Sequence, residues 1–340
     1  MRAVVVGSGT VGARAGRQLL FLGHLDDVVV VDAYPARAAA VAESFGRPAR
    51  AVDGNGLASL EPGDVALLAT PNNHRALAEE ALERGAHVVS VGDGPDDVRA
   101  LLALDAAARA QGLNVVVGAG FAPGLTCVLA ALAARAFERV VEIRVAKVGT
   151  GGPACGRQQQ AALKGEALDW RDGQWHGRRA GSGREQCWFP DPVRGIDCYR
   201  ASLADAVLLH HAFPEAERVS ARLGASRRDR LAAHLPLRPK VDPEGELGAV
   251  RVEVRGAQGV ALDDRVLGAV DRPAVAAGAV AAMAARWALD GRLSGPGASG
   301  LAGLVEPGPF LAALAERGVK VAVFEGSEHG NGNPLPSPSA

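Results

Sequence analysis

The chain has 340 residues, enough for about two domains with substantial cores. Its 37 basic and 38 acidic residues are interspersed and give a formal net charge of −1. This balance excludes binding to nucleic acid or to a membrane surface through charge alone. The longest apolar run, 274–289, is short for a membrane span and contains Arg286, so we expect a buried helix there. The four cysteines have neither the spacing of a metal site nor that of a disulfide framework, which favours a cytoplasmic protein with reduced thiols.

The first 120 residues alternate between short apolar runs and helical patterns. Continuous apolar strands separated by helices are typical of a parallel sheet that is covered on both faces. We therefore expect an α/β fold in which residues 1–124 form a doubly wound Rossmann domain. The predicted strands are 2–9, 26–33, 64–70, 86–92 and 113–120, and the predicted helices are 11–22, 36–45, 74–85 and 96–112.

From about residue 125 the pattern changes, and we expect residues 125–292 to form an α+β substrate domain with a mixed sheet. Within a glycine-rich stretch of little periodicity, Asp172 and Gly173 suit a type I′ turn between Trp170 and Trp175. The other predicted elements are an apolar helix (125–136), a strand (138–148), a helix (202–211), a strand (218–224), a long hairpin (249–270) and a helix (273–289).

The C-terminal segment 293–326 contains a helix and a strand of the first domain's type, and we expect it to return to the Rossmann domain. Residues 327–340 are rich in Pro, Ser and Asn, which is typical of a disordered tail. The alternating strands at 139–147 and 249–271 have few charges on one face, and that face needs covering. This pattern predicts a homodimer that forms through the substrate domain.

The turn after the first strand has the spacing GxGxxG. Gly7 permits a tight turn, Gly9 lets the backbone approach a pyrophosphate, and Gly12 lets helix and strand pack closely. The next helix begins at Thr10 and Val11, and a helix N-terminus faces the phosphates of a bound dinucleotide. These five residues are therefore candidates for cofactor binding.

Asp32 makes this motif more specific, because it ends the second strand 20 residues after Gly12. Its carboxylate is placed to accept hydrogen bonds from ribose hydroxyls and would repel the extra phosphate of NADP, so we expect NAD as the cofactor. Arg37 leaves NADP open: it either reaches a 2′-phosphate or is an exposed helix arginine. The alternative for the whole motif is an α/β turn that binds no nucleotide.

A second glycine-rich turn, "VGAGFAPGL" (117–125), does not match the dinucleotide spacing. Ligands of doubly wound sheets bind at the carboxyl ends of the strands, where this turn lies. Its glycines admit a ligand close to the backbone, and the helix that starts at Gly124 offers N–H groups to an anion. We interpret the turn as the floor of the substrate site, the alternative being a packing turn without ligand contact. The substrate-contact candidates here are Gly120, Phe121, Pro123 and Gly124.

Two passages resemble the saccharopine dehydrogenase-like oxidoreductases, particularly the lysine 6-dehydrogenase branch. They are "DAAARAQGLNVVVGAGFAPGLTCVLA" (105–130) and "EPGPFLAALAERGVKVAVF" (306–324), beside the N-terminal GxGxxG. The resemblance implies NAD(P)-dependent oxidative deamination of an amino acid, or the reverse reductive amination, and a substrate domain that often dimerises. The segment 149–177 does not align with lysine-specific members, so substrate identity does not carry over.

The passage "ATPNNHRALAEEALERGAHVVSVG" (69–92) is similar to the glucose–fructose oxidoreductase and inositol dehydrogenase family. In that family a lysine of an E-K-P motif serves the chemistry, whereas this chain has no lysine between residues 1 and 146. The sugar-alcohol mechanism of that family therefore lacks its key residue. We still expect Thr70, Pro71 and Asn72 to line the nicotinamide side of the cofactor, because the strand that ends there faces it.

Oxidation of an amine requires a base with a suitable pKa. His74 and Asp93 each follow a predicted strand at the carboxyl edge of the sheet and are the catalytic candidates. The alternatives are a helix-capping or solvent-facing role for His74 and a helix N-cap for Asp93. Arg157 follows the next glycine run and either clamps a substrate carboxylate or is a solvated loop arginine.

The sequence thus predicts an NAD-dependent oxidoreductase that acts on a C–N bond of an amino acid or a small amine or imine. Two alternatives stay open. One is an alcohol or sugar dehydrogenase of the glucose–fructose oxidoreductase type, and the other is a non-catalytic protein that senses NAD.

Overall fold

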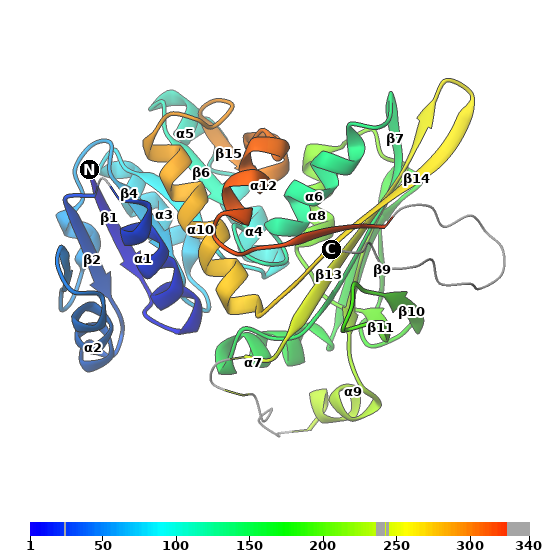
Figure 1. Cartoon of the computed structure of the whole chain (residues 1–340), viewed down its shortest axis with the longest axis horizontal. Coiled ribbons are helices and arrows are strands. Elements are labelled where there is room, and N and C mark those ends of the chain that lie inside the picture. Colours follow the sequence, from blue (N-terminus) through cyan, green and yellow to red (C-terminus); the bar gives the residue numbers. More distant parts are fainter. Residues whose placement is uncertain (24, 236–241, 243–244, 325–340) are drawn as a thin grey trace, which may run out of the picture.

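The computed structural model describes residues 1–23, 25–235, 242 and 245–324, and it contains two β-sheets with helices packed between and around them (Figure 1). The tail that we expected to be disordered, 327–340, lies outside the described residues. None of the helices in the described ranges is long and apolar enough to cross a membrane.

The first sheet is parallel throughout, which confirms the doubly wound Rossmann fold. Its strand order is β15 (Gly297–Gly300), β6 (Asn114–Val117), β5 (His87–Ser90), β4 (Val65–Leu68), β1 (Arg2–Val6), β2 (Asp27–Val31) and β3 (Ala49–Ala51). The associated helices are α1 (Thr10–Leu22), α2 (Pro35–Phe45), η1 (Gly56–Ser59), α3 (His74–Glu83), α4 (Pro95–Leu102) and α5 (Asp105–Ala110). The helix predicted for 96–112 is therefore two helices, with a break at residues 103–104, and the short β3 was not predicted.

The second sheet is mixed, as expected, because β12 runs parallel to β7 while the other neighbours are antiparallel. Its order is β10 (Glu185–Trp188), β11 (Gly195–Arg200), β12 (Arg218–Gly224), β7 (Arg139–Val148), β13 (Gly248–Gln258), β14 (Ala261–Asp271) and β16 (Val321–Phe324). The hairpin of β8 (Glu166–Arg171) and β9 (Gln174–Arg179) joins it at β12. Asp172 and Gly173 have φ angles of 52° and 79°, and Trp170 pairs with Trp175, so the predicted type I′ hairpin is confirmed.

The apolar face of the second sheet is covered within the chain itself. Helices α6 (Leu125–Ala134) and α8 (Asp205–Ala212) pack on the side that faces the first sheet (Figure 1). Ile143 and Val252 are buried on this side. The opposite side carries charges, among them Arg144 and Glu253. Our reason for expecting a homodimer, an apolar sheet face in need of cover, is therefore wrong.

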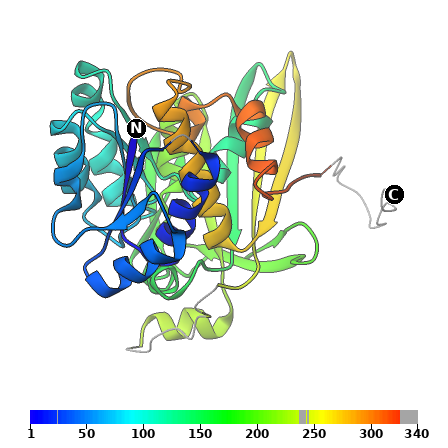
Figure 2. The same cartoon turned by 60° about the vertical axis from the view of Figure 1, so that its left-hand side comes forward.

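Helix α10 (Pro273–Leu289) is the buried, small-residue helix that the sequence predicted, since 14 of its 17 residues are buried. It packs along α1, where a Cβ on Gly278 would lie only 2.7 Å from the Cβ of Arg14 (Figure 2). Only a glycine lets the two helices approach so closely. This helix thus covers the Rossmann sheet although it falls within the range expected for the substrate domain.

The C-terminal segment divides between the two sheets. Strand β15 extends the Rossmann sheet beside β6, followed by α11 (Leu301–Leu304) and α12 (Pro307–Ala315). Strand β16, which we expected in the first domain, instead pairs antiparallel with β14 at the edge of the second sheet. A strand of this kind has no local signal that selects one free edge over another. The domain limits at residues 124 and 292 stay a proposal.

Candidate active site

The GxGxxG turn has the geometry that a dinucleotide requires. A Cβ on Gly7 (φ 99°) would lie 2.6 Å from the Ala69 carbonyl oxygen, and one on Gly12 would lie 1.8 Å from the Gly7 carbonyl oxygen. A Cβ on Gly9, in contrast, would meet nothing within 4 Å. Gly7 and Gly12 are thus required by packing, whereas Gly9 leaves open space at the N-terminus of α1. That space fits a pyrophosphate on the helix N-terminus.

Asp32 lies at the end of β2 and its side chain is only 3% exposed. Its carboxylate accepts hydrogen bonds from the backbone N–H and the hydroxyl of Ser8, both at 2.8 Å, and from the N–H of Tyr34 at 2.9 Å. Arg37 forms a bidentate ion pair with it. Burial raises the pKa of Asp32, but these hydrogen bonds, that of Arg37 foremost, outweigh burial and lower it to about 2. The Asp32 carboxylate is therefore negatively charged at neutral pH.

The loop after β4 carries the TPNNH passage, and His74 holds it in place. The His74 ring is fully buried, with Nε2 2.7 Å from the Thr70 carbonyl oxygen and Nδ1 2.7 Å from the Ser90 hydroxyl. Since a carbonyl only accepts, Nε2 donates to it and Nδ1 accepts from Ser90. Both nitrogens are thus engaged inside the protein. His74 connects the loop after β4 to the end of β5, and this catalytic candidate is absent from the walls of the cavity at the second glycine turn.

The second glycine turn is both a packing turn and a cavity wall. Gly124 (φ 125°) is required by packing, because a Cβ there would lie 2.2 Å from the Gly120 carbonyl oxygen. The N–H of Leu125 donates to that same oxygen at 2.9 Å, so it is not offered to an anion as we expected. Gly120, Phe121 and Pro123 line a cavity, whereas Gly124 does not.

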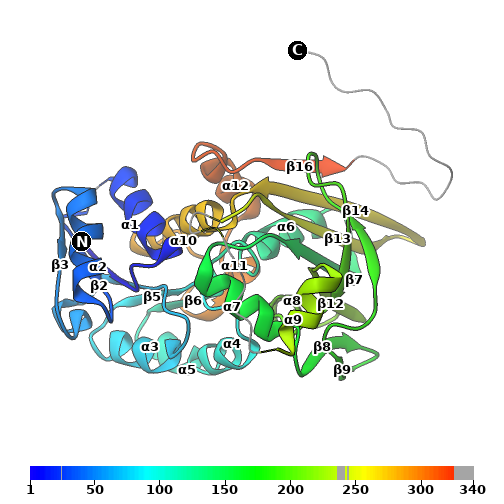
Figure 3. The same cartoon turned by 90° about the horizontal axis from the view of Figure 1, so that it is seen from below.

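This inner cavity has a volume of about 110 Å³ and joins the two glycine turns. Its walls come from the first turn of α1 (Gly9, Thr10 and Val11), the loops after β4 and β5, the second glycine turn, α10 and α7 (Pro153–Ala162). Thr70 and Pro71 contribute to it, but Asn72 does not. Helix α7 lies between the two sheets (Figure 3), and Gln158 at its cavity side donates to the Pro71 carbonyl oxygen at 3.0 Å. Arg157 is exposed and does not reach the cavity.

Two charged side chains from different sheets meet in the inner cavity. Asp93 follows β5, and its carboxylate oxygen lies 3.8 Å from Nζ of Lys147 on β7. Lys147 is nearly buried and also donates to the Ala122 carbonyl oxygen at 2.9 Å. Asp93 does not cap the next helix, whose N-cap is Gly94. The structure therefore keeps Asp93 as a candidate and adds Lys147, which was not among the residues predicted from the sequence.

A local signal for Lys147 was present in its strand. Strand β7 alternates, and Lys147 has the same parity as Ile143 and Val145, which are buried. A lysine on the buried face of a strand is rarely left without a partner and points to a site. The resemblance to the E-K-P family directs attention to the segment just after the TPNNH passage, whereas this lysine is supplied by the other sheet.

A buried carboxylate lies behind this pair. Asp205 at the start of α8 is fully buried, and its Oδ1 accepts a hydrogen bond of 2.6 Å from the Thr126 hydroxyl. Its Oδ2 has no hydrogen-bond partner. Burial raises the pKa of Asp205, while the charge of Lys147 and the Thr126 hydroxyl act in the opposite direction.

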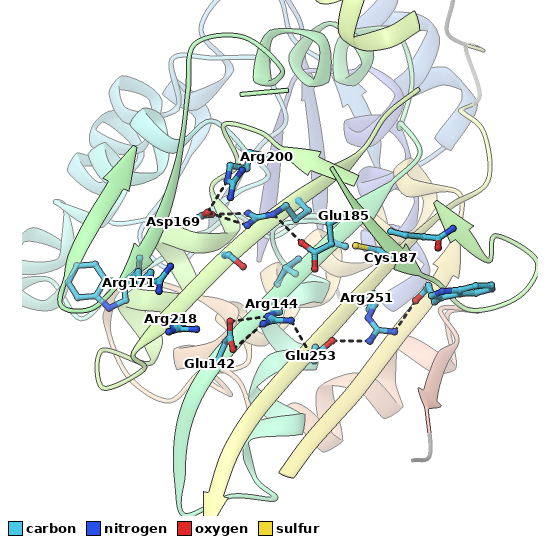
Figure 4. Close-up of a pocket in the computed structure, with 17 residues that line it drawn as sticks. Glu142, Arg144, Asp169, Arg171, Glu185, Cys187, Arg200, Arg218, Arg251 and Glu253 are labelled. Carbon is cyan, nitrogen blue, oxygen red and sulfur yellow. Dashed lines mark hydrogen bonds and ion pairs between the residues drawn. The ribbon is translucent and has the colours of Figure 1, made fainter. Parts of the chain in front are cut away.

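A larger cavity of about 350 Å³ lies on the outer face of the second sheet (Figure 4). Six arginines and four carboxylates line it, and most of them pair with one another. Arg144 binds Glu142 through Nε at 2.9 Å, and Arg222 binds both oxygens of Asp169 at 2.9 and 3.2 Å. The residues of the glycine turns are absent from its walls. Within the described ranges, no group of three His, Cys, Asp or Glu side chains could hold a metal ion.

Comparisons with known proteins agree with a dinucleotide site at the first glycine turn. The family model described as "Oxidoreductase family, NAD-binding Rossmann fold", GFO_IDH_MocA, matches residues 1–119. No curated protein sequence matches the chain. The fold is similar to that of saccharopine dehydrogenase (L-Glu forming) from Saccharomyces cerevisiae, with a TM-score of 0.67 at 17% identity over 95% of this chain and 99% of that one. It is also similar to an amine dehydrogenase from Mycobacterium smegmatis, with a TM-score of 0.50 at 12% identity over 90% and 96% of the two chains.

Both resemblances in the sequence are therefore supported, one by the Rossmann domain and the other by the fold of the whole chain. The open space beside Gly9 and the carboxylate of Asp32 fit NAD, the cofactor that the family model names. Residues 1–119 match the model of this family of NAD-binding oxidoreductases, and the protein is an NAD(P)-dependent dehydrogenase or reductase.

Proposed function

We propose that the protein oxidises the C–N bond of an amino acid or small amine, or reduces the corresponding imine, with NAD. The observation that carries this proposal is the pair of Asp93 and Lys147, 3.8 Å apart in the cavity that begins at Gly9. A carboxylate suits a substrate ammonium, and a neighbouring ammonium suits the water that must add to an imine.

The balanced oxidation converts R2CH–NH3⁺, NAD⁺ and water into R2C=O, NH4⁺, NADH and a proton. The bound cofactor supplies the acceptor for the hydride that leaves the carbon. Asp93 would accept the proton that leaves the substrate nitrogen. Lys147, as an ammonium, would donate a hydrogen bond to the water that adds to the imine carbon and give a proton to the departing nitrogen, and a proton from that water would replace it. The Ala122 carbonyl, which accepts from Lys147 at 2.9 Å, fixes the direction of its side chain.

The other site residues would bind and orient. Gly9, Thr10 and Val11 would contact the pyrophosphate, and Gly7 and Gly12 would shape the turn that presents them. Thr70 and Pro71 would line the nicotinamide end, with Gly120, Phe121 and Pro123 on the substrate side, since all of these contribute to the inner cavity. We no longer assign a substrate or cofactor contact to Asn72, Gly124 or Arg157.

Asp32 would bind the ribose hydroxyls, and this supports NAD over NADP. Its charge is permanent at neutral pH because its pKa is lowered to about 2, chiefly by Arg37 and against the effect of burial. Arg37 is engaged by Asp32 and lies over the Tyr34 ring, 5.0 Å from its centroid. A 2′-phosphate would have to compete with both contacts.

A small alcohol or carbonyl compound is the second candidate substrate. We disfavoured this alternative because the chain has no lysine before residue 147, but Lys147 now supplies an ammonium from the second sheet. A polyol remains a poor fit, because each of its hydroxyls needs a polar partner and the walls include Val91, Phe121, Pro123 and Ala277. A protein that only senses NAD would not need the ion pair of Asp93 and Lys147 in this cavity.

A substrate panel tests the proposal. The full chain is incubated with NAD and matched amines, amino acids and alcohols, and the formation of NADH is followed by its absorbance. We expect turnover of compounds with a C–N bond and its loss in Asp93→Asn, while NADH still binds. Turnover confined to alcohols would overturn the assignment to C–N chemistry, and no turnover of any amine, amino acid or alcohol would favour the sensing alternative.

Two further properties remain proposals. We propose a cytoplasmic location, which is supported by the four cysteines, all free in the structure. A homodimer through the second domain is also proposed, and the charged outer face of its sheet is the surface left to meet a second copy. Light scattering at micromolar concentration tests the dimer, and a monomer mass would contradict it.

A further inference from the structure

The charged side chains of the inner cavity limit which substrates it can bind. Among the described residues that line it, Lys147 is the sole cation and Asp93 the sole carboxylate. Lys147 already contacts both Asp93 and the Ala122 carbonyl oxygen. Recognition of a carboxylate typically uses a guanidinium with two parallel donors, and the described walls of this cavity contain none.

The backbone N–H groups around the cavity do not replace the missing guanidinium as donors to a carboxylate. The N-terminus of α7 faces the cavity and would be the natural place for a carboxylate. Pro153 in its first turn has no N–H group. Cys155 lines the cavity at this helix terminus, and burial raises the pKa of its thiol. A neutral thiol there offers no positive charge to an anion.

The walls favour an apolar substituent instead. Phe121, Pro123, Ala154 and Ala277 contribute to the cavity. Its volume of about 110 Å³ is smaller than the roughly 150 Å³ of a cavity that admits benzene. This volume includes the space beside Gly9 and Thr70 that the cofactor would occupy. The part left beside the Asp93 and Lys147 pair therefore suits a reacting carbon, its nitrogen and a few apolar carbons.

We propose that the substrate is a small, mainly apolar primary amine, or the ketone and ammonia in the reverse direction, that carries no carboxylate group. This inference rests on the proposed C–N chemistry and narrows it, because amino acids and larger polycarboxylate amines would bring an unpaired negative charge into the cavity. Leaving a buried charge without a partner is costly enough to reduce binding by at least about 100-fold.

The test compares sec-butylamine, 2-aminobutyrate and 2-butanol, which share a four-carbon skeleton. Relative to sec-butylamine, 2-aminobutyrate has a carboxylate in place of one methyl group, and 2-butanol has a hydroxyl in place of the amine. Both kcat/KM with NAD and binding to the complex with NADH, measured by calorimetry, are determined. We expect kcat/KM and affinity for sec-butylamine to exceed those for 2-aminobutyrate by at least about 100-fold. Preference for 2-aminobutyrate in either measurement, or no binding of sec-butylamine, would overturn this inference and leave C–N chemistry standing. Turnover of 2-butanol alone would instead defeat the proposed function.

A gain-of-function variant sharpens the test. Ala154→Arg adds a guanidinium to the cavity wall at the first turn of α7. We expect it to raise the affinity for 2-aminobutyrate relative to sec-butylamine by at least about tenfold. Arg157→Ala, on the exposed side of the same helix, is the matched control and should leave the ratio unchanged. An unchanged ratio in a folded Ala154→Arg protein would show that lack of a guanidinium does not determine specificity.

Discussion

The two cavities of this protein differ in size and charge, and the smaller, less charged one is the proposed active site. The outer one is about three times larger, 350 against 110 Å³, and carries ten charged side chains against two. All four of its carboxylates pair with arginines across the sheet surface, and an excess of two positive charges is spread over six arginines (Figure 4). The inner cavity has one ion pair, held at 3.8 Å and placed beside the dinucleotide turn. Its position and its isolated pair, rather than size or total charge, are the reasons for proposing it as the reactive site.

A single strand produces this difference. Residues of β7 alternate between the two faces of the second sheet, so that Lys147 reaches the inner cavity while Arg144 reaches the outer one. The two side chains stand three positions apart and have the same charge. Substitutions at these positions consequently provide matched tests of which cavity is catalytic.

The largest effect is expected for Lys147→Met, which keeps the apolar stem and removes the ammonium. Turnover should fall by about 10³-fold, as is usual when a positioned acid–base group is lost, while NADH affinity changes little. Arg144→Met on the opposite face is the control and should retain activity. Equal losses in both variants, measured as kcat/KM, would contradict the division between the two cavities.

Gly9→Val should abolish cofactor binding without unfolding the protein. A Cβ on Gly9 meets no atom within 4 Å, so the side chain would enter only the space proposed for the pyrophosphate. We expect the Kd for NADH to rise by at least about 100-fold, with a melting temperature close to that of the parent. Gly12→Ala should instead lower the melting temperature, because its Cβ would lie 1.8 Å from the Gly7 carbonyl oxygen. Intact NADH binding in Gly9→Val would place the cofactor elsewhere.

Gly120→Val tests the floor of the inner cavity. A Cβ there would lie 3.1 Å from the Pro123 carbonyl oxygen, and the branched side chain would enter the substrate space. NADH affinity should remain, while turnover falls by about 100-fold through loss of reactive geometry. Affinity and melting temperature are measured on the same preparation as turnover. A folded variant with full turnover would show that this turn is only structural.

Arg222→Ala should show the reverse behaviour, losing stability and keeping activity. Its guanidinium is 13% exposed and binds Asp169, which is 18% exposed. Removing it leaves that carboxylate to the more distant Arg200 at 3.6 Å. The free energy of unfolding should fall by about 1–3 kcal/mol, whereas Arg218→Ala at an exposed position should change it by less than about 0.5 kcal/mol. If Arg222→Ala loses turnover under conditions in which the variant is fully folded, the outer cavity has a catalytic role.

The smallest effect concerns the choice of cofactor. NADH should bind at least several-fold more tightly than NADPH, because Asp32 remains charged and holds Arg37. Arg37→Ala should widen this preference if the arginine gives NADPH any residual binding. A fluorescence titration in which the native protein prefers NADPH would show that Arg37 exchanges its partner for the phosphate.

The sequence by itself determined the Rossmann domain and its cofactor turn, because these depend on local rules. Apolar runs, helix periodicity and glycine spacing each act within about 30 residues, and the structure places Gly7, Gly9, Gly12 and Asp32 as those rules predict. The Trp170 hairpin was predictable for the same reason, since Asp172 and Gly173 are confined to one turn.

Only the tertiary structure decided the rest of the site. His74 has a suitable position in the sequence, yet packing of β4 against β5 buries it and engages both its nitrogens. Lys147 has a local signal, its place on the buried face of β7, but its partner Asp93 is 54 residues away, in a loop that follows a strand of the other sheet. The choice of an edge for β16 and the burial of α10 on α1 are likewise long-range outcomes. Such contacts depend on which surfaces meet after the elements have formed, and periodicity within one element carries no information about its neighbours in space.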